Sequence, residues 1–369
     1  MKTFINTKLL LGILVATLGF MLFACKKDKK EDTNTKPSSK NIGCDTIEIF
    51  RDINSPTLWK EGKVYVIRSW IDINATLDIE PGTIIKFENN KCGMEIYAKV
   101  TAEGTKTKPI IFTSFKDDSY CGDNNGDNKA SKPAKGDWGR ITMRGAQHGS
   151  SFIYCKFLYG GGDGNGVIYI NPGVGDLHDF TFDHCTFAHT SAKNGTINSN
   201  AAFSGAAMKD DNVSVLRDNY FFDNTKPIFI STQYSLNTSN QFNNPDKATE
   251  TNQYNGIFLL VEPLNGKTVG LSSLNAPYVI DDTLALSGSD VLVVGHKVTV
   301  KFTKNSMITA QNNNQFAADA SASFTSYKDD SRGGDTNGDT GASTPAKGDW
   351  EGIKIDDTCY STNVFYSNQ

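Results

Sequence analysis

Two copies of an acidic loop carry the residues best suited to binding a metal ion. In each copy, side chains with oxygen atoms recur at alternate positions, and a glycine before the last acid permits a tight curl. The residues are Asp123, Asn125 and Asp127 in the first copy and Asp335, Asn337 and Asp339 in the second. Ca²⁺ in proteins takes about six to eight oxygen ligands from carboxylates, amides and carbonyls. The spacing therefore predicts that each loop binds calcium.

This spacing resembles the start of EF-hand-like and dockerin calcium loops. It departs from them at the twelfth position, where a bidentate acid belongs and this chain has Ala134 or Ala346. Other acids would have to complete each ligand shell, and the candidates are Asp117, Asp118 and Asp137 in the first copy and Asp329, Asp330 and Asp349 in the second. Alternatively, the Asp and Asn side chains bind only the backbone amides of turns, without an ion.

The two loops belong to an internal duplication. Residues 112–141 and 324–353 have nearly the same sequence, and equivalent residues such as Asp123 and Asp335 are 212 positions apart without any insertion. Trp138 and Trp350 follow a Gly-Asp pair where each loop returns to a strand. We expect each indole to anchor the end of its loop by packing, and the alternative is a platform on which a sugar stacks.

Four histidines lie near a shorter repeat between the loops, and they are His148, His178, His184 and His189. No acid accompanies them at a spacing typical of a catalytic pair, so we interpret them as surface or corner residues. The sequence therefore predicts no catalytic residue.

Strands must position these loops, because helical apolar spacing is absent beyond the N-terminal segment. Val298, Val300 and Phe302 alternate with polar residues, which is the period of a half-buried strand. Similar short apolar segments precede both loops, so the duplication extends over roughly residues 60–141 and 275–353. The 33 glycines, against 11 prolines, also favour a protein of strands and turns.

A finer repeat of 30 to 34 residues lies between the loops. Its three copies are Phe152, Cys155 and Phe157, then Phe182, Cys185 and Phe187, then Leu216, Asn219 and Phe221. Short strands with corners in a unit of this length predict a solenoid in which equivalent residues stack about 4.8 Å apart. We expect a ladder of Cys155, Cys185 and Asn219 beside a phenylalanine stack. Free stacked thiols are preferred over a Cys155–Cys185 disulfide, because stacked side chains point the same way.

With these motifs, the chain resembles the right-handed parallel β-helix proteins of bacterial surfaces, in the pectin-lyase-like group. The segment IEPGTIIKF at residues 79–87 and the two acidic loops carry the resemblance. It implies an all-β, right-handed parallel β-helix with long acidic loop excursions. It implies little chemistry, since the Gly-His-Gly and Arg-Ile-Lys elements of polygalacturonases are not matched at residues 295–297 and 352–354.

The N-terminal residues are typical of an export signal. Lys2 and Lys8 precede an apolar run at residues 9–24, and the sequence before Cys25 resembles a bacterial lipobox. An ordinary cleaved signal is the alternative. The predicted organisation is a lipoprotein signal peptide (1–24), a lipidated disordered tether (25–43), a β-helix module (44–270) and a partial second module (271–369), stacked on or following the first.

The expected function is that of an exported surface protein anchored in the outer membrane or at the cell surface through lipid on Cys25. It would act as a structural, adhesive or glycan-binding module, with polysaccharide or a host or cell-surface protein as partner. The formal charge of −4 becomes −6 without Lys2 and Lys8, which argues against nucleic acid as a partner. The alternative function is a lyase or hydrolase that acts on acidic polysaccharide.

Overall fold

The computed structural model describes residues 35–37, 44–144, 149–170, 179–192, 200–208 and 214–368. Every regular element in these ranges is a β-strand, which confirms the predicted all-β class. No helix in the same ranges is long and apolar enough to cross a membrane. The predicted signal, Cys25, His148 and His178 lie outside the described residues.

Three sheets make up the first two thirds of the chain. An eight-stranded sheet contains β1 (Thr35–Pro37), β2 (Asp45–Ile49), β4 (Lys63–Ile67), β7 (Ile84–Phe87), β10 (Ile110–Ser114), β13 (Cys155–Leu158), β16 (Thr186–Ala188) and β19 (Tyr220–Phe222). A six-stranded sheet contains β3 (Thr57–Trp59), β6 (Leu77–Ile79), β9 (Val100–Glu103), β12 (Ser150–Ile153), β15 (Phe180–Asp183) and β18 (Val215–Arg217).

The third sheet has ten strands and continues into the last third of the chain. It contains β5 (Trp70–Ile73), β8 (Gly93–Ile96), β11 (Ile141–Met143), β14 (Ile168–Ile170), β17 (Phe203–Gly205), β20 (Ile228–Ser231), β21 (Ile257–Leu260), β23 (Tyr278–Ile280), β26 (Thr299–Phe302) and β29 (Ser323–Ser326). It therefore crosses the predicted module boundary at residue 270 without interruption.

Two smaller sheets complete the second half. One contains β22 (Thr268–Leu271), β25 (Val291–Val294) and β28 (Phe316–Ala318), and the other contains β24 (Thr283–Leu286), β27 (Met307–Ala310), β30 (Gly352–Ile355) and β31 (Thr358–Cys359). Among the described strands, antiparallel pairing occurs only between β1 and β2 and between β30 and β31. Residues 35–37 thus take strand structure within the segment predicted as a tether.

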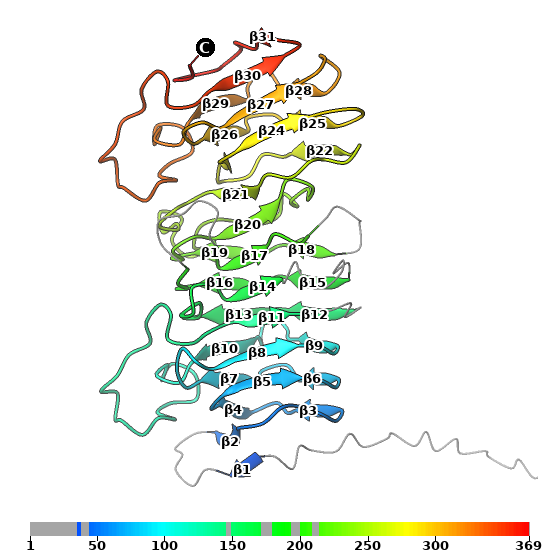
Figure 1. Cartoon of the computed structure of the whole chain (residues 1–369). Coiled ribbons are helices and arrows are strands. Elements are labelled where there is room, and N and C mark those ends of the chain that lie inside the picture. Colours follow the sequence, from blue (N-terminus) through cyan, green and yellow to red (C-terminus); the bar gives the residue numbers. More distant parts are fainter. Residues whose placement is uncertain are drawn as a thin grey trace, which may run out of the picture.

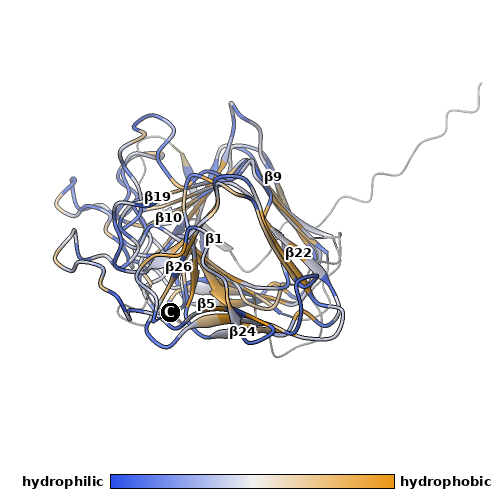
Figure 2. Cartoon of the chain, turned by 90° about the horizontal axis from the view of Figure 1, so that it is seen from above, coloured by the Kyte–Doolittle hydropathy of each residue, from blue (hydrophilic) through white to orange (hydrophobic). Residues whose placement is uncertain are grey.

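Sheet neighbours in the first half are usually three strands apart in the sequence, as in the order β7, β10, β13, β16. The chain thus visits three sheets in turn and returns to the first one layer further along, and we call each such circuit a rung. Figure 1 shows the rungs stacked in one column, and Figure 2, viewed along the stack, shows strands on three sides. This arrangement is compatible with a parallel β-solenoid.

The predicted phenylalanine stack is present in the core. Phe157 is the register partner of Phe187, and Phe187 is the register partner of Phe221. Their rings stack with centroids 5.1 and 4.7 Å apart, and all three side chains are fully buried. The spacing of 30 and 34 residues therefore identified the rung correctly.

The Cys and Asn ladder is also present, at a corner of each rung. The Cys155 thiol donates to the carbonyl of Ala102 at 3.2 Å, and the Cys185 thiol donates to the carbonyl of Phe152 at the same distance. In the next rung, Asn219 donates through Nδ2 to a carbonyl of the rung before it, at 3.0 Å. Both thiols are free and buried, as expected.

One disulfide was not predicted. Cys44, at the start of the first rung, is bonded to Cys121 in the first acidic loop, 77 residues away. The second loop has Gly333 at the equivalent position. Nothing in the cysteine spacing indicates this bond, because it depends on the loop folding back over the outer face of the eight-stranded sheet.

The two acidic loops project from the same side of the stack (Figure 1). The first follows β10 in the eight-stranded sheet, whereas the second follows β29 in the ten-stranded sheet. The duplicated sequence therefore builds the same local structure on two different sheets.

Candidate functional site

Each acidic loop folds over a lysine that points outward from its sheet. Lys86 on β7 and Lys301 on β26 have 0% exposed surface. The ammonium of Lys86 donates to the carbonyls of Asp117 at 2.7 Å and Gly122 at 3.3 Å. Burial lowers the pKa of both lysines to about 8.

The second loop repeats this contact with small changes. Lys301 donates to the carbonyl of Gly334 at 2.5 Å and to Oγ1 of Thr336 at 3.2 Å. Neither lysine was predicted to be buried, because a lysine that alternates with apolar residues in a strand indicates a solvated face. The signal that could have found them is the duplication itself, since Lys86 and Lys301 occupy equivalent positions before the two loops.

Three carboxylates meet in each loop, close to the lysine. The groups are Asp118, Asp123 and Asp127 in the first loop and Asp330, Asp335 and Asp339 in the second, and in each group the carboxylate oxygens lie within 4.8 Å of one another. Several acids were proposed to complete the ligand shells. Of these, the structure places Asp118 and Asp330 next to the two predicted aspartate ligands of their loops. We call each group of three an acidic cluster.

One carboxylate oxygen in each acidic cluster is buried and has no hydrogen-bond partner among the described residues. It is Oδ1 of Asp118 in the first loop and Oδ1 of Asp330 in the second. Burial, followed by repulsion from Asp123 or Asp335, raises the pKa of these two acids. Each cluster therefore contains a carboxylate with one desolvated oxygen that is not hydrogen-bonded within the described residues, although the nearby lysine offsets part of its charge.

The other proposed ligands are used within the loops. Asp117 accepts from Thr113 Oγ1 at 2.6 Å, and Asp329 accepts from Thr325 Oγ1 at 2.6 Å. Both are buried and lie outside the acidic clusters. Asp137 accepts from Lys116 at 2.8 Å, and its counterpart Asp349 is bound by Lys328 in the same way.

The two asparagines also brace their loops. The Nδ2 atom of Asn125 donates to Asp127 at 3.0 Å, and that of Asn337 donates to Asp339 at 2.7 Å. Asp123 accepts the backbone N–H of Gly126 at 2.6 Å, as expected for a turn. The structure thus contains both the turn contacts and the convergent carboxylates that the sequence pattern allowed.

Trp138 and Trp350 lie inside the core, at 0% exposure. Trp138 stacks on Phe87 and Trp350 stacks on Phe302, each with ring centroids 4.0 Å apart. The Trp138 indole N–H donates to the carbonyl of Leu158 at 2.7 Å. Neither indole offers an exposed face on which a sugar could stack.

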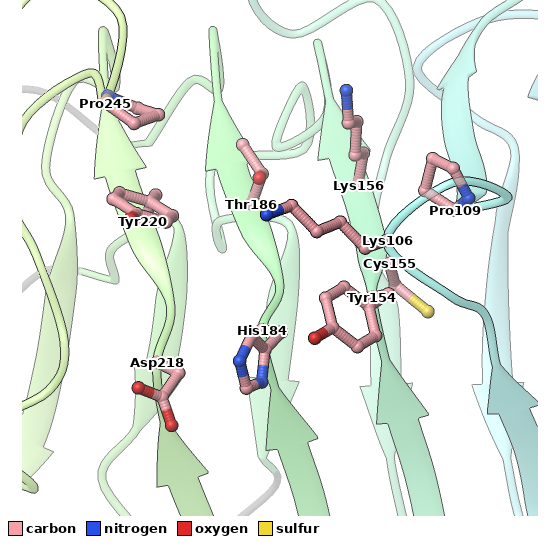
Figure 3. Close-up of a pocket in the computed structure, with 10 residues that line it drawn as sticks. All are labelled: Lys106, Pro109, Tyr154, Cys155, Lys156, His184, Thr186, Asp218, Tyr220 and Pro245. Carbon is pink, nitrogen blue, oxygen red and sulfur yellow. The ribbon is translucent and has the colours of Figure 1, made fainter.

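A groove lies on the outer face of β13, β16 and β19, with a volume of about 350 Å³ (Figure 3). The side chains of Lys106, Tyr154, Lys156, His184, Asp218 and Tyr220 are among those that line it. Sequence analysis did not predict this groove, because its floor is made by outward residues of three separate rungs.

His184 has an acid partner that sequence analysis overlooked. Its Nδ1 atom lies 2.6 Å from Oδ1 of Asp183, which is buried, and Arg217 donates to the other oxygen of Asp183 at 2.7 Å. A carboxylate oxygen of Asp218 lies within 4.8 Å of a ring nitrogen of His184 and of a carboxylate oxygen of Asp183. This histidine therefore has acid partners, contrary to the prediction, because Asp183 precedes it directly and Asp218 is one rung away.

His189 likewise has an acid partner in the next rung, since its Nδ1 atom lies 2.7 Å from Asp223. The rungs thus carry the same residue types at two corners: Tyr154, His184 and Asp218 form one column, and Tyr159, His189 and Asp223 form the other. All six have positive φ, between 48° and 64°. The sequence contains a signal for these columns in the hexapeptides YCKFLY, HCTFAH and DNYFFD. Each hexapeptide has the same residue at its first and last positions, which are the two corners.

Comparisons with models of protein families, with curated protein sequences and with solved structures found no match. The functional assignment therefore depends on the residues and their geometry.

The buried lysines predict an unusual dependence of stability on alkaline pH. The pKa of Lys86 and Lys301 is about 8 in the folded chain and near 10.5 when unfolded, so the unfolded chain binds more protons between these values. The free energy of unfolding should therefore rise from about pH 8 to about pH 9.5, by roughly 1 kcal/mol for each lysine. Ionisation of tyrosines in the unfolded chain ends the rise near pH 10.

Urea unfolding at half-unit pH steps measures this rise. The double substitution Lys86→Met and Lys301→Met should reduce it, whereas Lys304→Met with Lys354→Met, at two exposed lysines, should leave it unchanged. An equal rise in both double variants would contradict the assignment.

Proposed function

We propose that the chain is a right-handed parallel β-helix of the kind found in bacterial surface lipoproteins, and that it works as a non-catalytic surface module. In this proposal, lipid on Cys25 anchors the exported protein to a membrane, and the rungs present a long face to polysaccharide or to a cell-surface protein. Ca²⁺ binds the two acidic loops and fixes their shape.

The observation that carries the calcium part of the proposal is the unpartnered carboxylate oxygen in each acidic cluster. A folded chain rarely buries a charged oxygen without a partner, because desolvation costs several kcal/mol. Asp118, Asp123 and Asp127 offer the hard oxygen atoms that Ca²⁺ prefers, and backbone carbonyls and water can complete such a shell. The lysine ammonium beneath each loop supplies one positive charge against three carboxylates, so a divalent cation fits the remaining charge.

The surface role is supported by the shape of the stack and by how its polar groups are used. Hydrogen bonds from Lys86 and Lys301 and to Asp117 stabilise the loops. The Asn and Cys ladder stabilises the corners. A rigid stack with loops fixed on one side suits presentation of a binding face.

Calorimetric titration should detect two Ca²⁺ ions per chain, with dissociation constants on the order of 10⁻⁴ to 10⁻³ M, as in extracellular modules. At a tenfold excess over the dissociation constant, each ion should raise the free energy of unfolding by about 1.4 kcal/mol. Protons compete for Asp118 and Asp330, whose pKa is raised above the ordinary carboxyl value, so this stabilisation should weaken as the pH is lowered from neutral toward that range.

The double substitution Asp118→Asn and Asp330→Asn removes one carboxylate from each cluster without removing a turn acceptor. It should weaken calcium binding at least about tenfold, whereas Asp246→Asn, at an exposed position, should not. Absence of both binding heat and thermal stabilisation at millimolar Ca²⁺ would refute the calcium part.

A second candidate function, a lyase acting on acidic polysaccharide, is favoured by His184. Asp183 fixes the orientation of the imidazole, as in pairs where a carboxylate positions a catalytic base. If the groove is a lyase site, uronic-acid polymers should yield unsaturated sugars, and His184→Gln should lower turnover at least about a hundredfold. Turnover that survives in His184→Gln, or no unsaturated product from any uronic-acid polymer, would exclude this function for the groove.

A further inference from the structure

The groove on the outer face of β13, β16 and β19 has features that the calcium loops and the rung ladders do not explain. It extends over three successive rungs, because Lys156, Thr186 and Tyr220 are register partners on adjacent strands. Neighbouring strands are about 4.8 Å apart, so its floor offers an outward side chain at each step along the stack. An extended, repeating ligand suits such a floor better than a compact one.

Positive charge gathers in this groove. Lys106 and Lys156 both line it, and within the described part of the chain neither ammonium forms an ion pair. Figure 3 shows the Lys106 side chain running across the groove toward Thr186. Asp218 is the one acid among the lining residues. On a chain with a formal charge of −4, a groove in which two lysines outnumber a single acid favours an anionic ligand.

Ring faces lie beside these cations. The Tyr154 and His184 rings are 4.6 Å apart at their centroids, and Tyr220 lies on the same face two rungs along. Aromatic faces at the surface pack well against the apolar faces of sugar rings, while their polar atoms accept or donate hydrogen bonds. The groove thus combines cations with ring platforms, which is the chemistry that recognises charged sugars.

A comparison inside the molecule indicates that these side chains are available to a ligand. The first acidic loop contacts the column of Tyr159, His189 and Asp223, because its Lys135 donates to Asp223 at 2.8 Å. The equivalent column of Tyr154, His184 and Asp218 opens into the groove instead.

We propose that this groove binds a segment of an anionic glycan, with Lys106 and Lys156 contacting its carboxylate or sulfate groups and Tyr154 and Tyr220 packing on its sugar rings. The inference rests on the proposed function as a surface module, and it adds the site and the class of ligand. Calcium binding by the acidic loops is not required for it.

The test measures binding of the whole chain to hexasaccharides of alginate, galacturonate and chondroitin sulfate, with cellohexaose as the neutral control and oligothymidylate as a competing anion. We expect at least one acidic hexasaccharide to bind more tightly than cellohexaose and oligothymidylate, and to bind less tightly as NaCl is raised. The double substitution Lys106→Ala and Lys156→Ala should weaken this binding at least about tenfold.

A matched double variant, Lys304→Ala with Lys354→Ala, removes the same charge from exposed positions in the second half of the chain and should bind as the parent does. Tyr154→Asn with Tyr220→Ser keeps the charge and should weaken binding through loss of the rings. Calcium titration of each variant in parallel separates this inference from the proposed calcium sites. Equal binding by the two lysine variants, tighter binding of oligothymidylate, or no acidic hexasaccharide bound by the folded chain would overturn the inference, whatever the result of the calcium titration.

Discussion

The in-register parallel pairing of successive rungs is the constraint on which the rest of the structure depends. Because side chains in a strand alternate between two faces, a shift of one residue would exchange the core face with the outer face. The phenylalanine stack, the corner ladder of Cys and Asn, and the two columns of Tyr, His and Asp all exist because equivalent residues lie directly above one another. A single register therefore determines both the core and the groove.

Each acidic loop places a buried positive charge next to a cluster of negative charges. Each loop covers outward apolar side chains of its sheet and buries a lysine under its backbone. The ammonium gives the loop carbonyls a strong donor and stands next to three carboxylates. Burial acts in opposite directions on the two kinds of group, lowering the pKa of Lys86 and raising that of Asp118. Both shifts follow from partial loss of hydration of the charged group, and a bound cation would favour the charged form of the acids.

The sequence permitted prediction of features that repeat locally. The rung length, the Phe ladder and the duplicated loops could all be recognised, since each repeats a short pattern at a fixed interval. Partners brought together by folding across rungs were missed. Asp218 and Asp223 lie 34 residues after His184 and His189, which is one rung, so no short spacing in the sequence links these acids to the histidines.

Two further features were beyond prediction for a different reason. Lys86 alternates with apolar residues as a solvated lysine would, and only the return of the loop over the sheet buries it. The bond between Cys44 and Cys121 depends on the same return, and the second loop does without it. In both cases the loop path decides the environment of the residue, and that path has no periodic signal.

Distances between spin labels along the outer face of the six-stranded sheet test the register most directly. Leu58, Asp78, Thr101, Ser151, Thr181 and Val215 form one column of register partners. In a chain with Cys359→Ser, labels at Leu58 and Thr181 should give backbone distances of about 19 Å, and labels at Leu58 and Val215 about 24 Å, because each rung adds about 4.8 Å. Broad distributions, or a difference between the pairs far from one strand spacing, would contradict the stacked register.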